Sequence, residues 1–307
     1  MDASPSGSLA AAEDGFVERR FSAPDGLMLS ARIYGEAIEG PLSAIWLSGL
    51  SRNARDFHAL ALHLSRDAAR PRKVVAFDYR GRGRSGYDRD WKNYNAATEA
   101  RDVLAGVVAL GVEHGAFIGT SRGGLIVHLL AAMRPGVLRA AVLNDVGPVI
   151  EGAGLAQIRA YLERAPKPAS FEEAVRILKA ANGTAFTALT DADWTRMAHA
   201  IYRDEGGRPV ADFDPNLIRM LRGIDLTRPL PVMWPQFAAL AAIPLMAIRG
   251  ENSTLLSAET LAEMARRHPQ LEAITVTGQG HPPLLETGDL PRRIASFLER
   301  ADSVTAA

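Results

Sequence analysis

Short apolar runs alternate along this chain with segments of helical periodicity, and this alternation constrains the fold more than any other feature. The runs lack polar alternation, which is typical of strands buried on both faces of a sheet. They cover residues 42–47, 73–77, 114–119 and 138–143. Between them, apolar residues recur at helical spacing over residues 53–69, 96–110 and 121–133. Strands and helices in this order predict a doubly wound, mostly parallel α/β sheet.

The sheet is expected to extend at both ends of this repeat. Residues 16–21 and 27–34 flank the turn Ala23-Pro24-Asp25-Gly26, which predicts an antiparallel hairpin at the start of the chain. Further strands are predicted towards the end, at residues 243–248 and 271–276, and helices at residues 258–267 and 289–300. Counting all of these runs, we expect an eight-stranded sheet.

The regular alternation of predicted strands and helices stops over residues 148–240. This stretch holds amphipathic segments, such as residues 171–181 and 193–202, separated by loops that contain proline and glycine. We interpret it as a helical cap inserted into the sheet domain. The expected division is a disordered tail at residues 1–15, a first part of the core at 16–147, the cap at 148–240 and a second part of the core at 241–307.

Composition and charge exclude several classes of function. The 35 basic residues (Lys and Arg) are balanced by 35 acidic ones, so the chain lacks the positive field that a nucleic-acid partner requires. The absence of cysteine excludes disulfides, a thiolate metal site and a cysteine nucleophile. No run approaches the ~18 apolar residues that span a bilayer, and the first residues do not read as a secretory signal. We therefore expect a cytoplasmic protein without a membrane partner.

The segment Gly119-Thr120-Ser121-Arg122-Gly123 fits the pattern G-x-S-x-G and lies between a predicted strand and a predicted helix. A tight strand-to-helix turn strains the serine backbone, and small residues two positions away on each side avoid a clash. The start of the helix favours negative charge on the serine oxygen. A phosphate-binding loop would require a lysine after the glycines, which is absent. We therefore interpret Ser121 as a nucleophile.

A serine hydroxyl is a weak nucleophile, so it needs a base within hydrogen-bond reach. Among the seven histidines, His281 is placed best, in a glycine-rich loop after the last predicted strand. That loop should lie at the carboxyl edge of the sheet, where α/β sheets place their sites. The other six histidines fall on predicted helices or at strand starts. His281 is therefore the candidate base.

The serine motif, the loop Asp-Tyr-Arg-Gly-Arg-Gly-Arg-Ser at residues 78–85 and the late Gly280-His281 pair resemble the α/β-hydrolase superfamily in order and spacing. The resemblance is to its capped branch of esterases, lactonases and carbon–carbon bond hydrolases, and it covers residues 16–298. It implies an oxyanion hole formed by the backbone N–H groups of Leu50 and Arg122. The family usually has His-Gly where this chain has Ser48-Gly49, so the glycine that the backbone turn needs is kept.

The resemblance also implies a carboxylate that accepts the second imidazole N–H of His281. The family most often places it in the loop after the strand that follows the cap, but similar sequences have Asp where this chain has Thr254. Glu251 lies in that loop, and its longer side chain could reach inwards. Asp145 follows the strand at residues 138–143, where some members place their acid. We favour Asp145 and keep Glu251 as the alternative; the remaining possibility is that neither orients the imidazole.

Arginine alternates with glycine in the loop at residues 78–85, at Arg80, Arg82 and Arg84. We interpret these side chains as solvated loop residues that donate hydrogen bonds to neighbouring carbonyls, in preference to an anion-binding site. The side chain of Arg122 has two open roles. It either pairs with an acid at the sheet edge or meets a carboxylate of the substrate.

These residues favour a serine hydrolase that cleaves a carboxylic ester of a small, largely apolar substrate through an acyl-enzyme. This chemistry requires no cofactor and no metal. A lactonase or a carbon–carbon bond hydrolase would use the same residues. A different class, a non-catalytic ligand receptor on the same fold, is permitted by the missing acid at Thr254. The oligomeric state is left open by the sequence.

Overall fold

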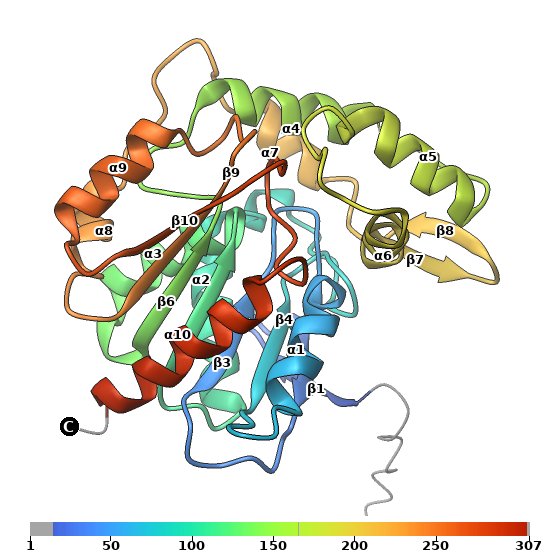
Figure 1. Ribbon diagram of the computed structural model, residues 1–307. Helices are drawn as coiled ribbons and strands as arrows, with labels where there is room; N and C mark the ends of the chain where they lie inside the picture. Colours follow the sequence, from blue (N-terminus) through green and yellow to red (C-terminus); the bar gives the residue numbers. More distant parts are fainter. Residues whose placement is uncertain (1–14, 165, 306–307) are drawn as a thin grey trace, which may run out of the picture.

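The computed structural model describes residues 15–164 and 166–305, and its central element is one eight-stranded sheet (Figure 1). The strands are β1 (Phe16–Ser22), β2 (Met28–Tyr34), β3 (Ser43–Leu47), β4 (Val74–Asp78), β5 (Gly115–Thr120), β6 (Leu138–Asn144), β9 (Leu245–Gly250) and β10 (Glu272–Val276). Their order is β1-β2-β4-β3-β5-β6-β9-β10. Strand β2 is antiparallel to both neighbours, whereas the pairs from β4 to β10 are parallel. The predicted eight-stranded, mostly parallel sheet is confirmed.

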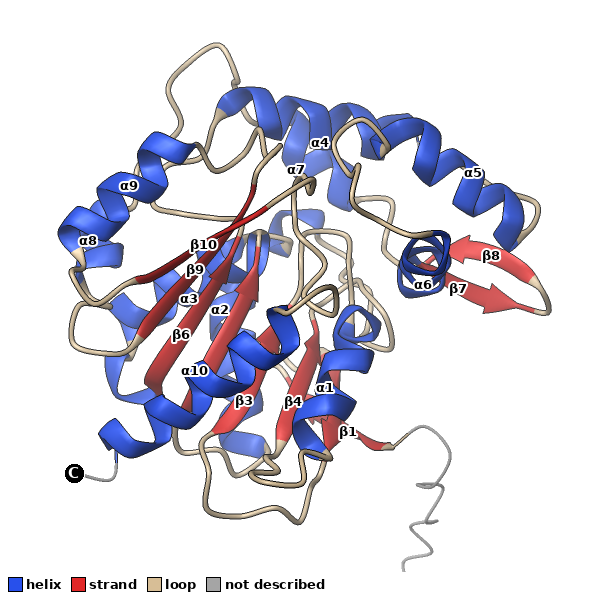
Figure 2. Ribbon diagram, viewed as in Figure 1, coloured by secondary structure: helices blue, strands red, loops and turns tan. Residues whose placement is uncertain are grey.

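Helices cover both faces of this sheet (Figure 2). Helices α1 (His58–Ser65) and α10 (Leu290–Thr305) cover one face. The other face is covered by α2 (Ala96–Ala109), α3 (Arg122–Met133), α8 (Trp234–Ala238) and α9 (Ala258–Arg267). Every residue of β4 and β5 is buried, as the runs without polar alternation predict. The tail expected at residues 1–15 lies outside the described residues except for Gly15.

Residues 148–240, the inserted segment, leave the sheet after β6, and the part of the segment before α8 lies beyond the carboxyl ends of the central strands (Figure 1). The segment contains α4 (Gly152–Arg164), α5 (Phe171–Asn182), α6 (Asp191–Ile201), α7 (Leu217–Arg222) and the hairpin of β7 (Tyr202–Glu205) and β8 (Arg208–Ala211). Helices α5 and α6 enclose a small apolar core of their own around Phe186 and Trp194. This part of the segment therefore has an apolar core that is separate from the cores on the two faces of the sheet.

The interpretation of the inserted segment as purely helical missed the β7–β8 hairpin. Strand β7 directly follows α6, so the helical pattern of residues 193–202 concealed the change of structure. Gly206 and Gly207 form the two-residue turn, with φ values of 65° and 88°. Two positive φ values are what a type I′ hairpin turn needs, and glycine adopts them without strain. This glycine pair was the available sequence signal.

Both ends of the inserted segment meet at the edge of the sheet domain. The N–H of Met233 donates to the carbonyl of Pro148 at 2.7 Å. Beyond this point α8 packs on α3, and Phe237 and Leu240 are buried in the core that contains α3. Residues 234–240 thus pack with the sheet domain, because their aromatic side chains complete its apolar core.

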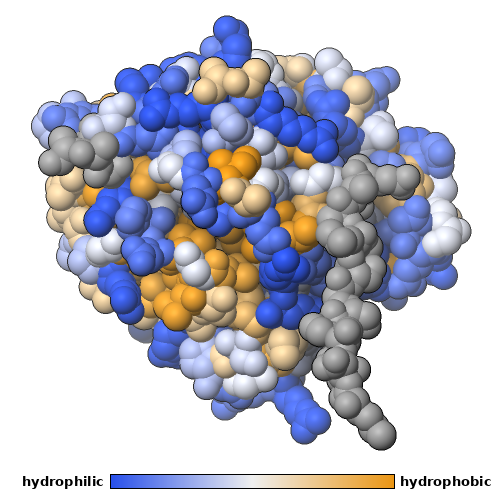
Figure 3. Space-filling view, turned by 90° about the horizontal axis from the view of Figure 1, so that it is seen from below, coloured by the Kyte–Doolittle hydropathy of each residue, from blue (hydrophilic) through white to orange (hydrophobic). Residues whose placement is uncertain are grey.

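The surface opposite the inserted segment carries a central area of apolar residues among hydrophilic ones (Figure 3). Within the described part of the chain, no helix combines the length and the apolarity that a membrane crossing requires.

Close packing between α3 and the sheet depends on two glycines. A Cβ atom on Gly123 would lie 2.0 Å from the backbone oxygen of Leu47 in β3. A Cβ atom on Gly124 would lie 2.1 Å from Cγ1 of Val146. Both distances are far below van der Waals contact, and the obstacle to Gly123 is backbone. The first turn of α3 can therefore pack against the carboxyl ends of β3 and β6 only because neither position carries a side chain.

We expect Gly123→Ala to lower the free energy of unfolding by about 1–3 kcal/mol, since the added methyl group must displace the Leu47 backbone. Gly136→Ala is the matched control, because a Cβ atom there has no neighbour within 4 Å. Its free energy of unfolding should stay within about 0.5 kcal/mol of the wild type. Urea unfolding followed by circular dichroism measures both. Equal effects of the two substitutions would contradict the packing argument.

One histidine of α3 is fully buried. The ring Nδ1–H of His128 donates to the carbonyl of Gly124 at 2.7 Å, and the ring lies 6.1 Å from that of Phe237. Burial lowers the pKa of His128 from its ordinary value of 6.5 to about 4. The imidazole therefore stays neutral in the folded protein.

Stability should fall as the pH is lowered from 6.5 to about 4, because the unfolded chain protonates His128 in this window and the folded protein does not. The contribution amounts to about 3 kcal/mol once the pH is below both values. His128→Leu should remove this part of the pH dependence. Comparing the free energies of unfolding of both proteins at pH 7 and pH 4.5 tests it, and identical pH slopes would contradict the assignment.

Candidate active site

The serine of the G-x-S-x-G motif lies in a sharp turn between β5 and α3. Ser121 has φ 51° and ψ −112°, in the left-handed half of backbone space that side chains rarely adopt. Its N–H donates to the carbonyl of Asn144 at 2.9 Å, and its carbonyl accepts from the N–H of Gly124 at 2.9 Å. These bonds hold the serine side chain at the carboxyl edge of the sheet, at the positive end of α3.

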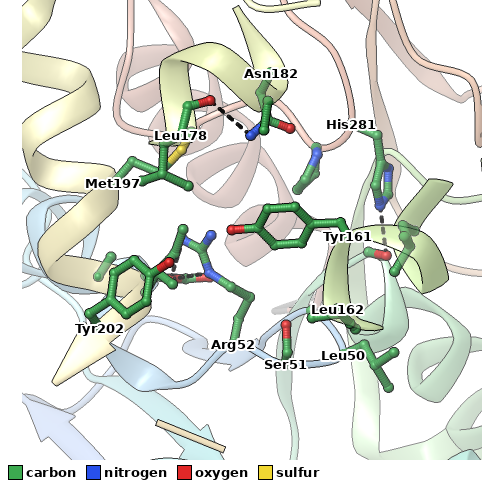
Figure 4. Close-up of a pocket in the computed structure, with 18 of the residues that line it drawn as sticks. Leu50, Ser51, Arg52, Tyr161, Leu162, Leu178, Asn182, Met197, Tyr202 and His281 are labelled. Atoms are coloured by element: carbon green, nitrogen blue, oxygen red, sulfur yellow. Dashed lines mark hydrogen bonds and ion pairs between the residues drawn. The ribbon is translucent and has the colours of Figure 1, made fainter. Parts of the chain in front are cut away.

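His281 lies in the loop after β10 and points towards this turn (Figure 4). Its Nε2 is 2.9 Å from Oγ of Ser121, and its Nδ1 is 2.6 Å from Oδ2 of Asp145. In the neutral ring, Nδ1–H donates to the carboxylate and Nε2 accepts from the hydroxyl. The structure therefore brings together the three side chains that sequence reasoning placed first.

The carboxylate of Asp145 is buried and accepts further hydrogen bonds from the loop after β9. Its Oδ1 accepts from the N–H of Gly250 at 2.9 Å, and its Oδ2 accepts from the hydroxyl of Ser253 at 2.5 Å. These donors fix the direction of the carboxylate towards His281. Sequence reasoning missed Ser253. The available signal was its position beside Thr254, where similar sequences have the acid.

The alternative acid lies elsewhere. Glu251 accepts from the N–H of Gly278 through Oε2 at 2.8 Å, so its side chain ties the loop after β9 to the loop after β10. The hydroxyl of Thr254 faces the side-chain oxygen of Gln157 at 2.9 Å. Of the two candidate acids, only Asp145 has a described contact with His281.

Of the two backbone groups expected to bind an oxyanion, one follows Ser121 directly in the chain and the other belongs to a residue of the cavity wall. Arg122 is the first residue of α3, and Leu50 lines the same cavity as the serine (Figure 4). The carbonyl of Gly49 accepts from the N–H of Arg52 at 3.2 Å. Because a trans peptide is planar, the N–H of Leu50 points away from that hydrogen bond.

The arginines of the loop at residues 78–85 are not all solvated. Arg80 and Arg82 are fully buried, whereas the side chain of Arg84 is 67% exposed. The interpretation as solvated residues was therefore wrong for the first two, because acids from α2 neutralise them. Arg80 pairs with Asp102 at 2.7 Å and Arg82 with Glu99 at 2.8 Å.

The side chain of Arg122 forms an ion pair inside the protein. Its Nε donates to Oε2 of Glu99 at 2.7 Å, and its side chain is only 11% exposed. Of the two roles considered, the ion pair with an acid at the sheet edge is the one that the structure contains.

A cavity of about 1200 Å³ opens between the inserted segment and the carboxyl edge of the sheet. Ser121 and His281 lie in its wall, together with Phe186 and other side chains from the inserted segment. Figure 4 shows four of these, Tyr161, Leu178, Met197 and Tyr202. Cavities for drug-sized ligands measure roughly 300–1,000 Å³, so this one accepts an extended small molecule.

The cavity wall also contains charge. Arg52 and Asp56 form an ion pair at 2.6 Å, and Glu286 lies in the same wall. Burial raises the pKa of Asp56 and of Glu286. Within the residues that the structure describes, no group of three or more His, Asp or Glu side chains is arranged to hold a metal ion.

A sequence profile described as the alpha/beta hydrolase family matches residues 44–296. The chain belongs to the α/β-hydrolase family. A 3-hydroxybutyrate-oligomer hydrolase from Cupriavidus necator is 31% identical over 250 residues, which cover 79% of this chain and 83% of that protein. A 2-(acetamidomethylene)succinate hydrolase from Mesorhizobium japonicum is 28% identical over 273 residues, which cover 88% of this chain and 90% of that protein.

Among solved structures, an α/β hydrolase from Novosphingobium aromaticivorans is similar, with 36% sequence identity and a TM-score of 0.86. The match covers 94% of this chain and 100% of that one. The superfamily inferred from the serine motif and the late histidine is confirmed, and the protein is an enzyme of the hydrolase type. The receptor alternative depended on the missing acid at Thr254, and Asp145 now stands in contact with His281 instead.

We expect Asp145→Asn to lower the turnover number by up to about 10⁴-fold, because an amide cannot stabilise the imidazolium that forms during proton transfer. Glu251→Gln is the control, since a glutamine oxygen can still accept from the N–H of Gly278. Its turnover number should stay close to that of the wild type. Steady-state hydrolysis of an activated ester measures both, and the opposite ranking would return the role of the acid to Glu251.

Proposed function

We propose that this protein is a serine hydrolase that cleaves a carboxylic ester through an acyl-enzyme. One observation carries the proposal: His281 is hydrogen-bonded to two side chains at once. Its Nε2 lies 2.9 Å from Oγ of Ser121, and its Nδ1 lies 2.6 Å from Oδ2 of Asp145. A hydroxyl, an imidazole and a carboxylate in this order can activate the serine at neutral pH.

The reaction proceeds in two halves. Ser121 attacks the ester carbonyl while His281 takes the hydroxyl proton, and the backbone N–H groups of Leu50 and Arg122 bind the oxyanion. His281 then gives this proton to the leaving alcohol, and the acyl group stays on the serine. In the second half a water molecule, activated by His281, attacks the acyl-enzyme and releases the carboxylic acid.

The proposed substrate is an extended small ester with mainly apolar contacts. The cavity volume of about 1200 Å³ supports it, as do the apolar side chains of Leu178, Phe186 and Met197 in the cavity wall. The name of the Cupriavidus relative adds a specific candidate, short oligomers of hydroxy acids joined by ester bonds. The inserted segment would act as the cap over this substrate, because it supplies the far wall of the cavity. A cytoplasmic location stays a prediction.

We expect a fluorophosphonate probe to label the wild-type protein and not Ser121→Ala, because the probe reacts only with an activated serine. The wild type should also hydrolyse p-nitrophenyl esters, with kcat/KM changing along a series of acyl lengths. Hydroxy-acid ester oligomers and simple lactones belong in the same series. Release of acid measured by titration at constant pH reports all of them. An unlabelled wild type that cleaves none of these substrates would refute the proposed function.

A further inference from the structure

A buried group of three charged side chains lies beneath the active site: Arg82, Glu99 and Arg122. Glu99, in the first turn of α2, is fully buried and joins the two arginines. Its Oε2 accepts from Nε of Arg122 at 2.7 Å, and its Oε1 forms an ion pair with Arg82 at 2.8 Å. We call these three residues the Glu99 network.

The network reaches both of the backbone segments that the proposed function assigns to the oxyanion. Nε of Arg82 donates to the carbonyl of Leu50 at 2.8 Å. The other end of the network is Arg122, which directly follows Ser121 in the chain and carries the second N–H group assigned to the oxyanion. Leu50 and Arg122 are 72 residues apart in the sequence. The Glu99 network is a continuous set of polar contacts between them.

The network has little freedom to move. Arg82 is fully buried, and its Nη1 also donates to the carbonyl of Arg80 at 2.6 Å. Its guanidinium lies 5.6 and 5.7 Å from the ring centres of Tyr79 and Tyr94. Burial acts to raise the pKa of Glu99, but Arg122 and Arg82 outweigh it and hold that pKa below the ordinary value. Glu99 is therefore an anion with a fixed place between two cations.

We propose that Glu99 and Arg82 are positioning residues that set the separation of the two oxyanion-binding N–H groups. The proposal rests on the proposed serine hydrolase function. An oxyanion hole works only when both donors lie about 2.7–3.1 Å from the oxygen in the transition state. Leu50 belongs to a loop and Arg122 to a helix, so their separation needs a rigid link, and the Glu99 network provides one.

A second buried arginine of the same loop offers a matched control. Arg80 is as deeply buried as Arg82, and it pairs with Asp102, Asp25 and Asp88. None of these described side-chain contacts involves Leu50 or Arg122. A substitution at Arg80 therefore disturbs another buried arginine and its ion pairs, and its side chain has no described contact with the oxyanion segments.

The test compares Arg82→Lys with Arg80→Lys. Lysine keeps the charge but loses the planar fork that lets Arg82 contact Glu99 and the Leu50 carbonyl together. We expect Arg82→Lys to lower kcat by about 10- to 100-fold with KM changed less than about 3-fold. The inhibition constant of an alkyl trifluoromethyl ketone, which forms a tetrahedral oxyanion on the serine, should rise by a similar factor. Arg80→Lys should keep kcat and the inhibition constant near wild type.

Equal losses of kcat in the two lysine variants, or a loss in Arg82→Lys without a change in ketone inhibition, would overturn the proposal. If Arg82→Lys does not fold, Arg122→Gln is the second variant to test. It leaves one buried cation, Arg82, paired with one buried anion, Glu99. It should lower kcat about 10-fold and weaken the ketone in parallel. Unchanged values in this variant also overturn the proposal. A wild type that the fluorophosphonate probe does not label would refute the proposed function itself, whereas labelled wild type with unaffected variants refutes only the positioning role.

Discussion

The site depends on one backbone conformation, the left-handed turn at Ser121. Among the non-glycine residues that the structure describes, positive φ values occur at Ser121 and Asp145 alone, and both belong to the candidate active site. Such conformations cost on the order of 1–3 kcal/mol each, so they persist only where the surrounding packing enforces them. At Ser121 that packing is the contact of α3 with β3 and β6, which Gly123 and Gly124 make possible.

The position of the acid follows from the order of the strands. Strands β5, β6 and β9 are neighbours and parallel, so their carboxyl ends lie side by side. An acid after β6 can therefore face the same imidazole as an acid after β9. In this chain the loop after β9 supplies donors, Gly250 and Ser253, and the loop after β6 supplies the carboxylate. His281 therefore has a carboxylate partner although this chain has Thr254 where similar sequences have an acid.

Most of the fold and the centre of the site were predictable, because they depend on local patterns. Buried strands, the serine motif and the Gly280-His281 pair each leave a short signature in the sequence. The choice between Asp145 and Glu251 depended on which loop faces the imidazole, and spacing alone does not contain that information. The β7–β8 hairpin was missed because a helical pattern runs up to its first residue. Ser253 was missed because its signal was indirect: it lies beside Thr254, the position where similar sequences have the acid.

Buried charge explains why the arginine loop was misinterpreted and why it matters. Arginines that alternate with glycine in a loop are typical of solvated residues. Arg80 and Arg82 are nevertheless buried, because α2 presents Glu99 and Asp102 three residues apart, on one face. Burying these ions is expensive, and well-packed apolar residues often give equal or greater stability. The burial of these pairs is therefore weak evidence for a gain in stability. The hydrogen bond from Arg82 to the Leu50 carbonyl is the contact on which the proposed positioning role depends, because it links the buried charges to the edge of the sheet that carries Ser121.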